Sequence, residues 1–149
     1  MFTISTGFII MPLTLKVRDV MEGGVVIVDG ELSAKDALNK MLEKGVWSVV
    51  VSVRGLPSGV VTERDLLRRV IAKGLDVNKV TLKEIMSSPL ITIDPDVPLG
   101  EAWNIMAAKG VRRLYVIENG KIIGRVTQTG LFNKLLDAVL TLSSIKYQL

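Results

Sequence analysis

A duplication constrains the fold of this chain more than any other feature of its sequence. Residues 17–66 align with residues 82–131 at a constant offset of 65 positions and without a gap. Short segments mark the register, for example Lys44-Gly45-Val46 against Lys109-Gly110-Val111. Two copies of one small unit predict a pseudo-twofold pair with a cleft between the copies. Positions at which the copies differ should therefore indicate where the function lies.

The chain is long enough for both copies to fold as one body. A chain of 149 residues buries roughly 68–70% of its unfolded surface, whereas a unit of about 60 residues is only marginally stable alone. We therefore expect one core shared by the copies and built mainly from Val, Ile, Leu and Met. The predicted organisation is an N-terminal arm (1–13), a first copy (14–76), a second copy (77–140) and a C-terminal tail (141–149).

The first 15 residues are uncharged and rather apolar. They lack the positive n-region of a signal peptide, are interrupted by Gly7 and Pro12, and are too short to span a membrane. We interpret them as an extended arm that packs on the module or on a partner. Met11 is a second candidate for the start of the chain.

Hydrophobic periodicity predicts the same order of elements, β-α-β-β-α, in each copy. Short apolar runs predict the strands, and apolar residues at i, i+3, i+4 and i+7 predict amphipathic helices. An Asn119-Gly120 pair is a strong signal for a hairpin turn, and Arg54-Gly55 takes its place in the first copy. The fold class is therefore α+β, a sandwich of two repeats related by a pseudo-twofold axis. Each repeat is predicted to contain a leading helical turn (17–21, 82–86), a first strand (25–28, 90–93), a first helix (34–42, 99–107), a hairpin, and a second helix that begins after Thr62 or Thr127.

Composition excludes several classes of chemistry. The chain contains no Cys and no His, which rules out disulfides, thiolate nucleophiles, the usual zinc sites and His-based general base catalysis. We therefore predict no metal site and no enzyme activity. The lack of Cys also fits a reducing compartment, and we expect a cytoplasmic protein.

The net charge of +4 and a pI near 9.5 indicate a mild preference for anionic ligands such as phosphates. The sequence has no long run of Lys and Arg, and no aromatic residues interleaved with basic ones. Nucleic acid is therefore a less favoured partner than a small phosphorylated ligand, and no membrane partner is expected.

The segment Gly59-Val60-Val61-Thr62-Glu63-Arg64-Asp65 lies between a predicted strand end and a predicted helix start. Free N–H groups at a helix N-terminus form a natural phosphate seat, to which the Thr62 hydroxyl adds a donor. Asp65 lies one turn into the helix, where its two oxygens can accept from both hydroxyls of a ribose. The same Thr-x-x-Asp spacing is also a capping box that only stabilises the helix. Both interpretations remain open.

The two copies differ at this segment. Gly130 stands where the first copy has Asp65, so the second copy keeps Thr127 but has no carboxylate there. Conversely, Arg112 and Arg113 stand opposite Trp47 and Ser48. Adjacent side chains on a strand point to opposite faces, so one Arg can reach a phosphate across the cleft. The alternative is that they form a solvated strand start or a surface ion pair.

The chain resembles a tandem pair of cystathionine β-synthase-type (CBS) domains, known as a Bateman module. The resemblance covers about residues 14–140 and depends on the order and repetition of several motifs. The motifs are Val17-Arg18-Asp19-Val20-Met21 with Leu82-Lys83-Glu84-Ile85-Met86, Gly59-Val60-Val61-Thr62-Glu63-Arg64-Asp65-Leu66, Gly110-Val111-Arg112-Arg113-Leu114-Tyr115-Val116-Ile117 and Asn119-Gly120-Lys121-Ile122-Ile123-Gly124.

The resemblance implies two clefts that hold adenosine-type ligands, namely AMP, ADP, ATP or S-adenosylmethionine, and a homodimer of modules. The family usually has Pro where this chain has Tyr115, a departure near the pocket, and Val50 departs as well. The predicted nucleotide site comprises Val25, Val46, Trp47, Val60, Thr62, Arg64, Asp65, Arg112 and Arg113. The predicted second, weaker site comprises Leu90, Val111, Arg125 and Thr127.

The sequence thus predicts a stand-alone regulatory module rather than an enzyme. It would bind an adenine nucleotide in the cleft of Asp65 and signal to a regulated partner protein. One alternative is a structural or dimerisation module with empty clefts, and a less favoured one is a nucleic-acid-binding protein.

Overall fold

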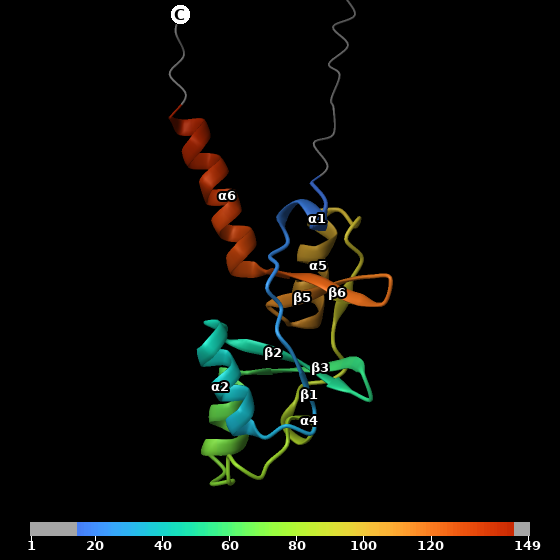
Figure 1. Ribbon diagram of the computed structural model, residues 1–149. Coiled ribbons are helices and arrows are strands. Elements are labelled where there is room, and N and C mark those ends of the chain that lie inside the picture. The colour runs from blue at the N-terminus through green and yellow to red at the C-terminus, as the bar shows by residue number, and fades with distance from the viewer. Residues whose placement is uncertain (1–14, 145–149) are drawn as a thin grey trace, which may run out of the picture.

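The computed structural model describes residues 15–144, so the predicted arm and Met11 lie outside the described residues. Two β-α-β-β-α units lie one above the other, which confirms the α+β fold class (Figure 1). The first unit contains β1 (Ile27–Asp29), α2 (Ala34–Lys44), β2 (Ser48–Val53), β3 (Leu56–Thr62), α3 (Glu63–Asp65) and the π-helix η1 (Leu66–Ile71). The second contains β4 (Thr92–Ile93), α5 (Leu99–Lys109), β5 (Arg113–Glu118), β6 (Lys121–Thr127) and α6 (Gln128–Ser143). The short leader helices α1 (Val17–Val20) and α4 (Leu82–Ile85) precede the two units.

Each unit has a three-stranded sheet with the same topology. The strand orders are β1-β2-β3 and β4-β5-β6, with the first pair parallel and the hairpin antiparallel. Both hairpins turn through two residues of positive φ, Arg54-Gly55 at 53° and 76° and Asn119-Gly120 at 52° and 75°. This is the geometry of the tight hairpin turn that the sequence predicts. No helix within residues 15–144 is long and apolar enough to cross a membrane.

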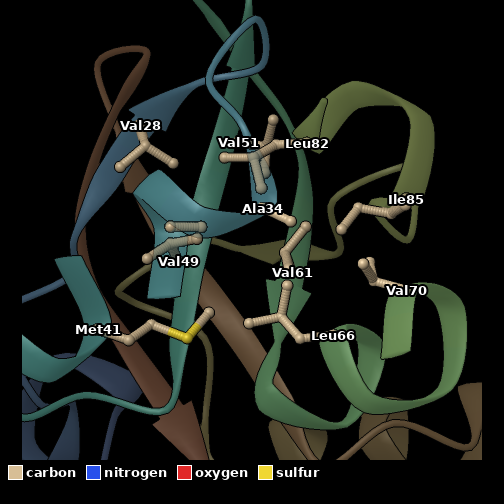
Figure 2. Packing of buried hydrophobic residues seen from close by; sticks show 11 residues of the cluster. Val28, Ala34, Met41, Val49, Val51, Val61, Leu66, Val70, Leu82 and Ile85 are labelled. Carbon is tan, nitrogen blue, oxygen red and sulfur yellow. The ribbon is translucent and has the colours of Figure 1, made fainter. Parts of the chain in front are cut away.

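The leader helices are exchanged between the two units. Leu82 and Ile85 of α4 are buried among the side chains of the first unit, Leu82 beside Val51 and Ile85 on the side of Val70 (Figure 2). Conversely, Val17 and Val20 of α1 belong to the core of the second unit. The expectation of one shared core is therefore wrong: the structure has two cores, and each is completed by the helix that leads into the other unit.

Backbone hydrogen bonds extend this exchange beyond the leader helices. Glu22 N donates to Arg125 O at 2.8 Å and Arg125 N to Glu22 O at 2.9 Å. At the equivalent place Val60 and Ser87 exchange hydrogen bonds of 3.0 and 2.9 Å. Because the chain must cross from one sheet to the other after these pairs, β1 and β4 begin two residues later than the apolar runs predict.

After each leader helix, at Glu22 and at Ser87, the chain crosses from one sheet to the other, and we call these two stretches the crossing segments. Two glycines allow the crossing segments to approach the sheets. A Cβ on Gly59 of β3 would lie 2.6 Å from Ser87 O and 2.7 Å from Met86 Sδ. A Cβ on Gly124 of β6 would lie 2.9 Å from both Glu22 O and Met21 Sδ. All four distances are shorter than real Cβ contacts, so glycine is required at this point of each unit.

Candidate functional site

The helix that follows β3 begins with a complete capping box. Asp65 Oδ2 accepts from Thr62 N at 2.8 Å and from Thr62 Oγ1 at 3.1 Å, and Asp65 N donates to Thr62 Oγ1 at 3.3 Å. The Asp65 side chain is only 15% exposed. The capping interpretation therefore describes the contacts of Oδ2, whereas Oδ1 makes none of these hydrogen bonds.

Arg69 connects this carboxylate to the crossing segment after α4. Its Nε lies 3.7 Å from Asp65 Oδ1, while its other two nitrogens donate to Ile85 O at 2.6 Å and Ser87 Oγ at 3.2 Å. Arg69 was not among the predicted site residues. Its spacing of four residues from Asp65 was the signal that could have identified this contact.

A hollow of about 90 Å³ lies between the two units, and Val60, two residues before Thr62 on β3, lines it. Val60 on β3 faces residues of the second unit across it, with Arg113 at the start of β5. The hollow is mainly apolar, and its lining includes four residues of the two predicted sites. The lining residues are Val60, Ser87, Pro89, Leu90, Ile91, Val111, Arg113 and Tyr115.

The grouping of the predicted residues differs from the sequence expectation. Leu90 and Val111, predicted for the second site, share the hollow with Val60 and Arg113 of the first site. Val25 and Val46, predicted for the first site, do not line it. The physical reason is the crossing segment: Val60 pairs with Ser87, and Leu90 N donates to Ser58 O at 3.1 Å, which brings the strand start of one unit against the other.

The pseudo-twofold relation between the units predicts a second position like that of the hollow, beside β6 instead of β3. Here Glu22 pairs with Arg125, and the chain then continues through Gly23 and Gly24 to Val25. Arg125 Nε lies 3.7 Å from Glu22 Oε2, and Thr127 Oγ1 accepts from Gly130 N at 2.9 Å at the start of α6. Arg125 and Thr127 therefore lie beside the segment that leads to Val25 and not beside the segment that leads to Leu90.

Tyr115 lines the hollow, but its hydroxyl is buried. Its side chain is 2% exposed, and among the described residues nothing hydrogen-bonds to its hydroxyl. A buried polar group without a partner is destabilising by about 1–3 kcal/mol. The missing Pro of the family pattern was the sequence signal for this position, but Tyr115 was not among the predicted site residues.

The remaining predicted site residues lie at the surface. Trp47 is 66% exposed, and Arg64 and Arg112 are also exposed. Arg112 and Arg113 do differ in their surroundings, as alternation on a strand predicts, and Arg113 is the one that lines the hollow.

Comparison with protein-family models matches the CBS domain twice, over residues 17–72 and 82–137. These segments cover most of the chain and coincide with the two units and their leader helices. The chain belongs to the CBS domain family.

Relatives and solved structures support the same assignment. An uncharacterized protein of Methanopyrus kandleri is 38% identical over 116 residues, which are 76% of this chain and 59% of that protein. The crystal structure of a hexameric CBS-CP12 protein from bloom-forming cyanobacteria matches with a TM-score of 0.75 and 27% identity, over 83% of this chain and 69% of that one. An uncharacterized conserved protein from Pyrococcus horikoshii matches with a TM-score of 0.73 and 28% identity, over 93% and 99% of the two chains. This chain therefore spans about three fifths of the Methanopyrus relative.

Proposed function

We propose that this CBS pair is a stand-alone regulatory module that binds an adenine nucleotide between its units and signals to a partner protein. The observation that carries the proposal is the hollow between the units. Both units line it, its walls are mainly apolar, Arg113 is among its lining residues, and the buried hydroxyl of Tyr115, which also lines it, has no partner among the described residues.

Each part of an adenine nucleotide finds matching chemistry in this cleft. Val60, Leu90 and Val111 offer an apolar slot for the flat faces of the base, and the Tyr115 hydroxyl can bond to a ring nitrogen. Asp65 Oδ1 would accept from the ribose. Thr62 and the N–H groups at the helix start, together with Arg113, would hold the phosphates.

The size of the hollow suggests how binding would produce a signal. Pockets that enclose a small organic ligand usually measure about 300–1,000 Å³, whereas this hollow is about 90 Å³. A nucleotide must therefore move β3 and the Leu90 segment apart, or move the side chains between them. Because Val60 and Ser87 link the units there, opening the hollow changes the position of one unit relative to the other. A ligand that prefers the open arrangement shifts the population towards it.

The module is not proposed to be an enzyme. Asp65 is the one carboxylate proposed for this cleft, and the chain contains neither His nor Cys. A general acid and base pair, or an activated nucleophile, therefore has no candidate residues in this cleft.

Exposed apolar side chains favour a homodimer. A hollow of about 490 Å³ between α5 and α6 is lined by Trp103, Phe132 and Leu135, which are 48%, 60% and 64% exposed. The offset of 65 places Leu38, Leu67 and Val70 at the same position of the first unit, where they line a hollow of about 220 Å³. A second copy can cover both surfaces at once, and α6 extends away from the body of the second unit where a second copy can pack against it (Figure 1).

Isothermal titration of the full chain with AMP, ADP, ATP and S-adenosylmethionine tests the proposed function. Flat titrations with all four ligands would leave the structural dimerisation module as the better explanation. Binding of a nucleic acid that falls steeply with salt and does not need Asp65 would favour a nucleic-acid partner.

Asp65→Ala and Asp36→Ala form a matched pair of variants for this experiment. Asp36 is the equivalent residue of the capping box that begins α2 with Ser33, a different helix from the one that follows β3. Each variant should lose about 0.5–2 kcal/mol of stability through its helix cap. Only Asp65→Ala should lose nucleotide binding, and equal binding by both variants would refute the role of Asp65.

A further inference from the structure

We propose that Glu22 supplies the carboxylate of the second cleft, which the sequence places in doubt because Gly130 replaces the equivalent of Asp65. A Cβ on Gly130 would lie 2.6 Å from Glu22 Oε1 and 2.9 Å from Thr127 Oγ1. The Glu22 carboxylate thus lies where the side chain of an Asp at position 130 would begin. This inference rests on the proposed function and extends it to a second nucleotide per chain.

Alignment of the two copies shows that the carboxylate belongs to a different segment in each copy. Glu22 is the counterpart of Ser87, and Gly130 is the counterpart of Asp65, both at the offset of 65. In the first cleft the helix carries the acid and the crossing segment carries the small polar residue. In the second cleft the crossing segment carries the acid and the helix carries the glycine. Each cleft therefore keeps one carboxylate beside a capping Thr.

The Glu22 carboxylate is available to a ligand. Its side chain is 46% exposed, and within residues 15–144 its one close charged contact is Arg125 Nε at 3.7 Å from Oε2. This distance is too long for a hydrogen bond but close enough for charge attraction, so Arg125 holds the carboxylate towards α6 and leaves its lone pairs free. Asp65, by contrast, uses one oxygen for its cap.

The surrounding groups suit the same class of ligand as the first cleft. Thr127 caps α6, a helix of 16 residues, where Gly130 N donates to Thr127 Oγ1 and Gln128 N donates to Arg112 O. Arg125 is 21% exposed, and its Nε has no hydrogen-bond partner among the described residues. A ribonucleotide would place its diol on Glu22 and its phosphate on Arg125.

The experiment is titration of the full chain with ATP and with 2′,3′-dideoxy-ATP, or with the AMP pair if wild type binds AMP more tightly. Wild type should bind two nucleotides per chain. Asp65→Ala should keep the site at Glu22, and Glu22→Ala should keep the site at Asp65. Each variant should weaken its own site about ten- to hundredfold, since that is the usual loss for a hydrogen bond to a charged group.

A rescue variant separates a ligand contact from a structural ion pair. In Glu22→Ala with Gly130→Asp, the new carboxylate occupies the freed space and takes the place that Asp65 has in the first cleft. This double variant should regain the second site, and it should discriminate between ATP and the dideoxy analogue as Asp65 does. If Glu22 serves only to pair with Arg125, the rescue fails.

The outcomes distinguish this inference from the proposed function. One bound nucleotide in wild type that Asp65→Ala abolishes would overturn the role of Glu22 and keep the proposed function. Two bound nucleotides that are insensitive to Glu22→Ala would also overturn it. Loss of the second site in Glu22→Ala, regained in the double variant, would support it. No binding in wild type would overturn both.

Discussion

Replacing Gly59 with alanine tests how tightly the two units are locked together beside the cleft. The new Cβ would lie 2.6 Å from Ser87 O, and ordinary contact begins near 3.4 Å, so the crossing segment must retreat by about 0.8 Å. Met86 has a flexible side chain that can move away, but Ser87 O belongs to the backbone. A retreat of this size takes the Val60–Ser87 hydrogen bonds, at 3.0 and 2.9 Å, beyond bonding distance.

The energetic cost follows from these two effects. Two backbone hydrogen bonds contribute about 0.5–1.5 kcal/mol each, and overpacking costs about 1–3 kcal/mol. Partial relaxation of the structure makes the total loss of stability smaller than the sum of these contributions. We therefore expect Gly59→Ala to be destabilised by about 2–4 kcal/mol. For a chain of this size the melting temperature should fall by roughly 5–15 °C.

Urea unfolding followed by circular dichroism measures the loss, and hydrogen exchange at the Val60 and Ser87 amides locates it. Gly100→Ala is the matched control, because Gly100 lies in the first turn of α5 with nothing within 4 Å of its Cβ. The control should gain up to about 1 kcal/mol from its helix propensity. Wild-type stability and unchanged exchange in Gly59→Ala would refute the argument that this glycine is required by the crossing segment.

Three further predictions address the cleft, the leaders and the partner. Tyr115→Phe should raise the stability of the unliganded protein by about 1 kcal/mol, because it removes a buried hydroxyl without a partner, and should weaken nucleotide binding about two- to tenfold; a change of the same sign in both measurements would contradict the role of this hydroxyl. Glu84 accepts from the backbone and hydroxyl of Thr81, which lowers its pKa below the usual 4.5, so its contribution is present above pH 4.5 and is lost as the pH falls through the folded-state value. Chemical unfolding between pH 7 and 3 should therefore show a smaller acid-induced loss for Glu84→Gln than for wild type, and parallel curves would exclude this contribution. Phe132→Lys should convert a dimer to a monomer in light scattering, because it charges an exposed apolar surface, and Lys121→Ala on the hairpin is the control that should leave the assembly unchanged.

The elements of this fold could be predicted from local signals. The apolar period of α2 and α5 sets their positions, and Gly45 and Gly110 end both helices in the left-handed conformation. The Arg54-Gly55 and Asn119-Gly120 turns fix both hairpins for the same local reason. The repeat order then indicates the family, because the duplication preserves these signals at one offset.

The composition of the clefts depended on contacts between distant segments. The sequence identified Thr62, Asp65 and Arg113 as candidates; in the structure Arg113 lines a hollow between the units, and Thr62 and Asp65 form a capping box. The sequence did not show that Leu90 and Val111 face Val60, nor that Arg69 donates to Ser87. These contacts exist because the leader segments cross between the units, and a crossing leaves no periodic signal in a single sequence.

The sequence by itself determined two similar units, their helices and turns, and the residue types with which a cleft could bind a phosphorylated ligand. Only the tertiary structure decided which segments of the two units face each other. One such contact is that of Glu22 with Gly130. The physical reason is that helix and turn preferences act over a few residues, whereas the partner of a crossing segment is chosen by packing. Here Leu82 and Ile85 are buried in the first unit and Val17 and Val20 in the second, and that exchange fixes both clefts.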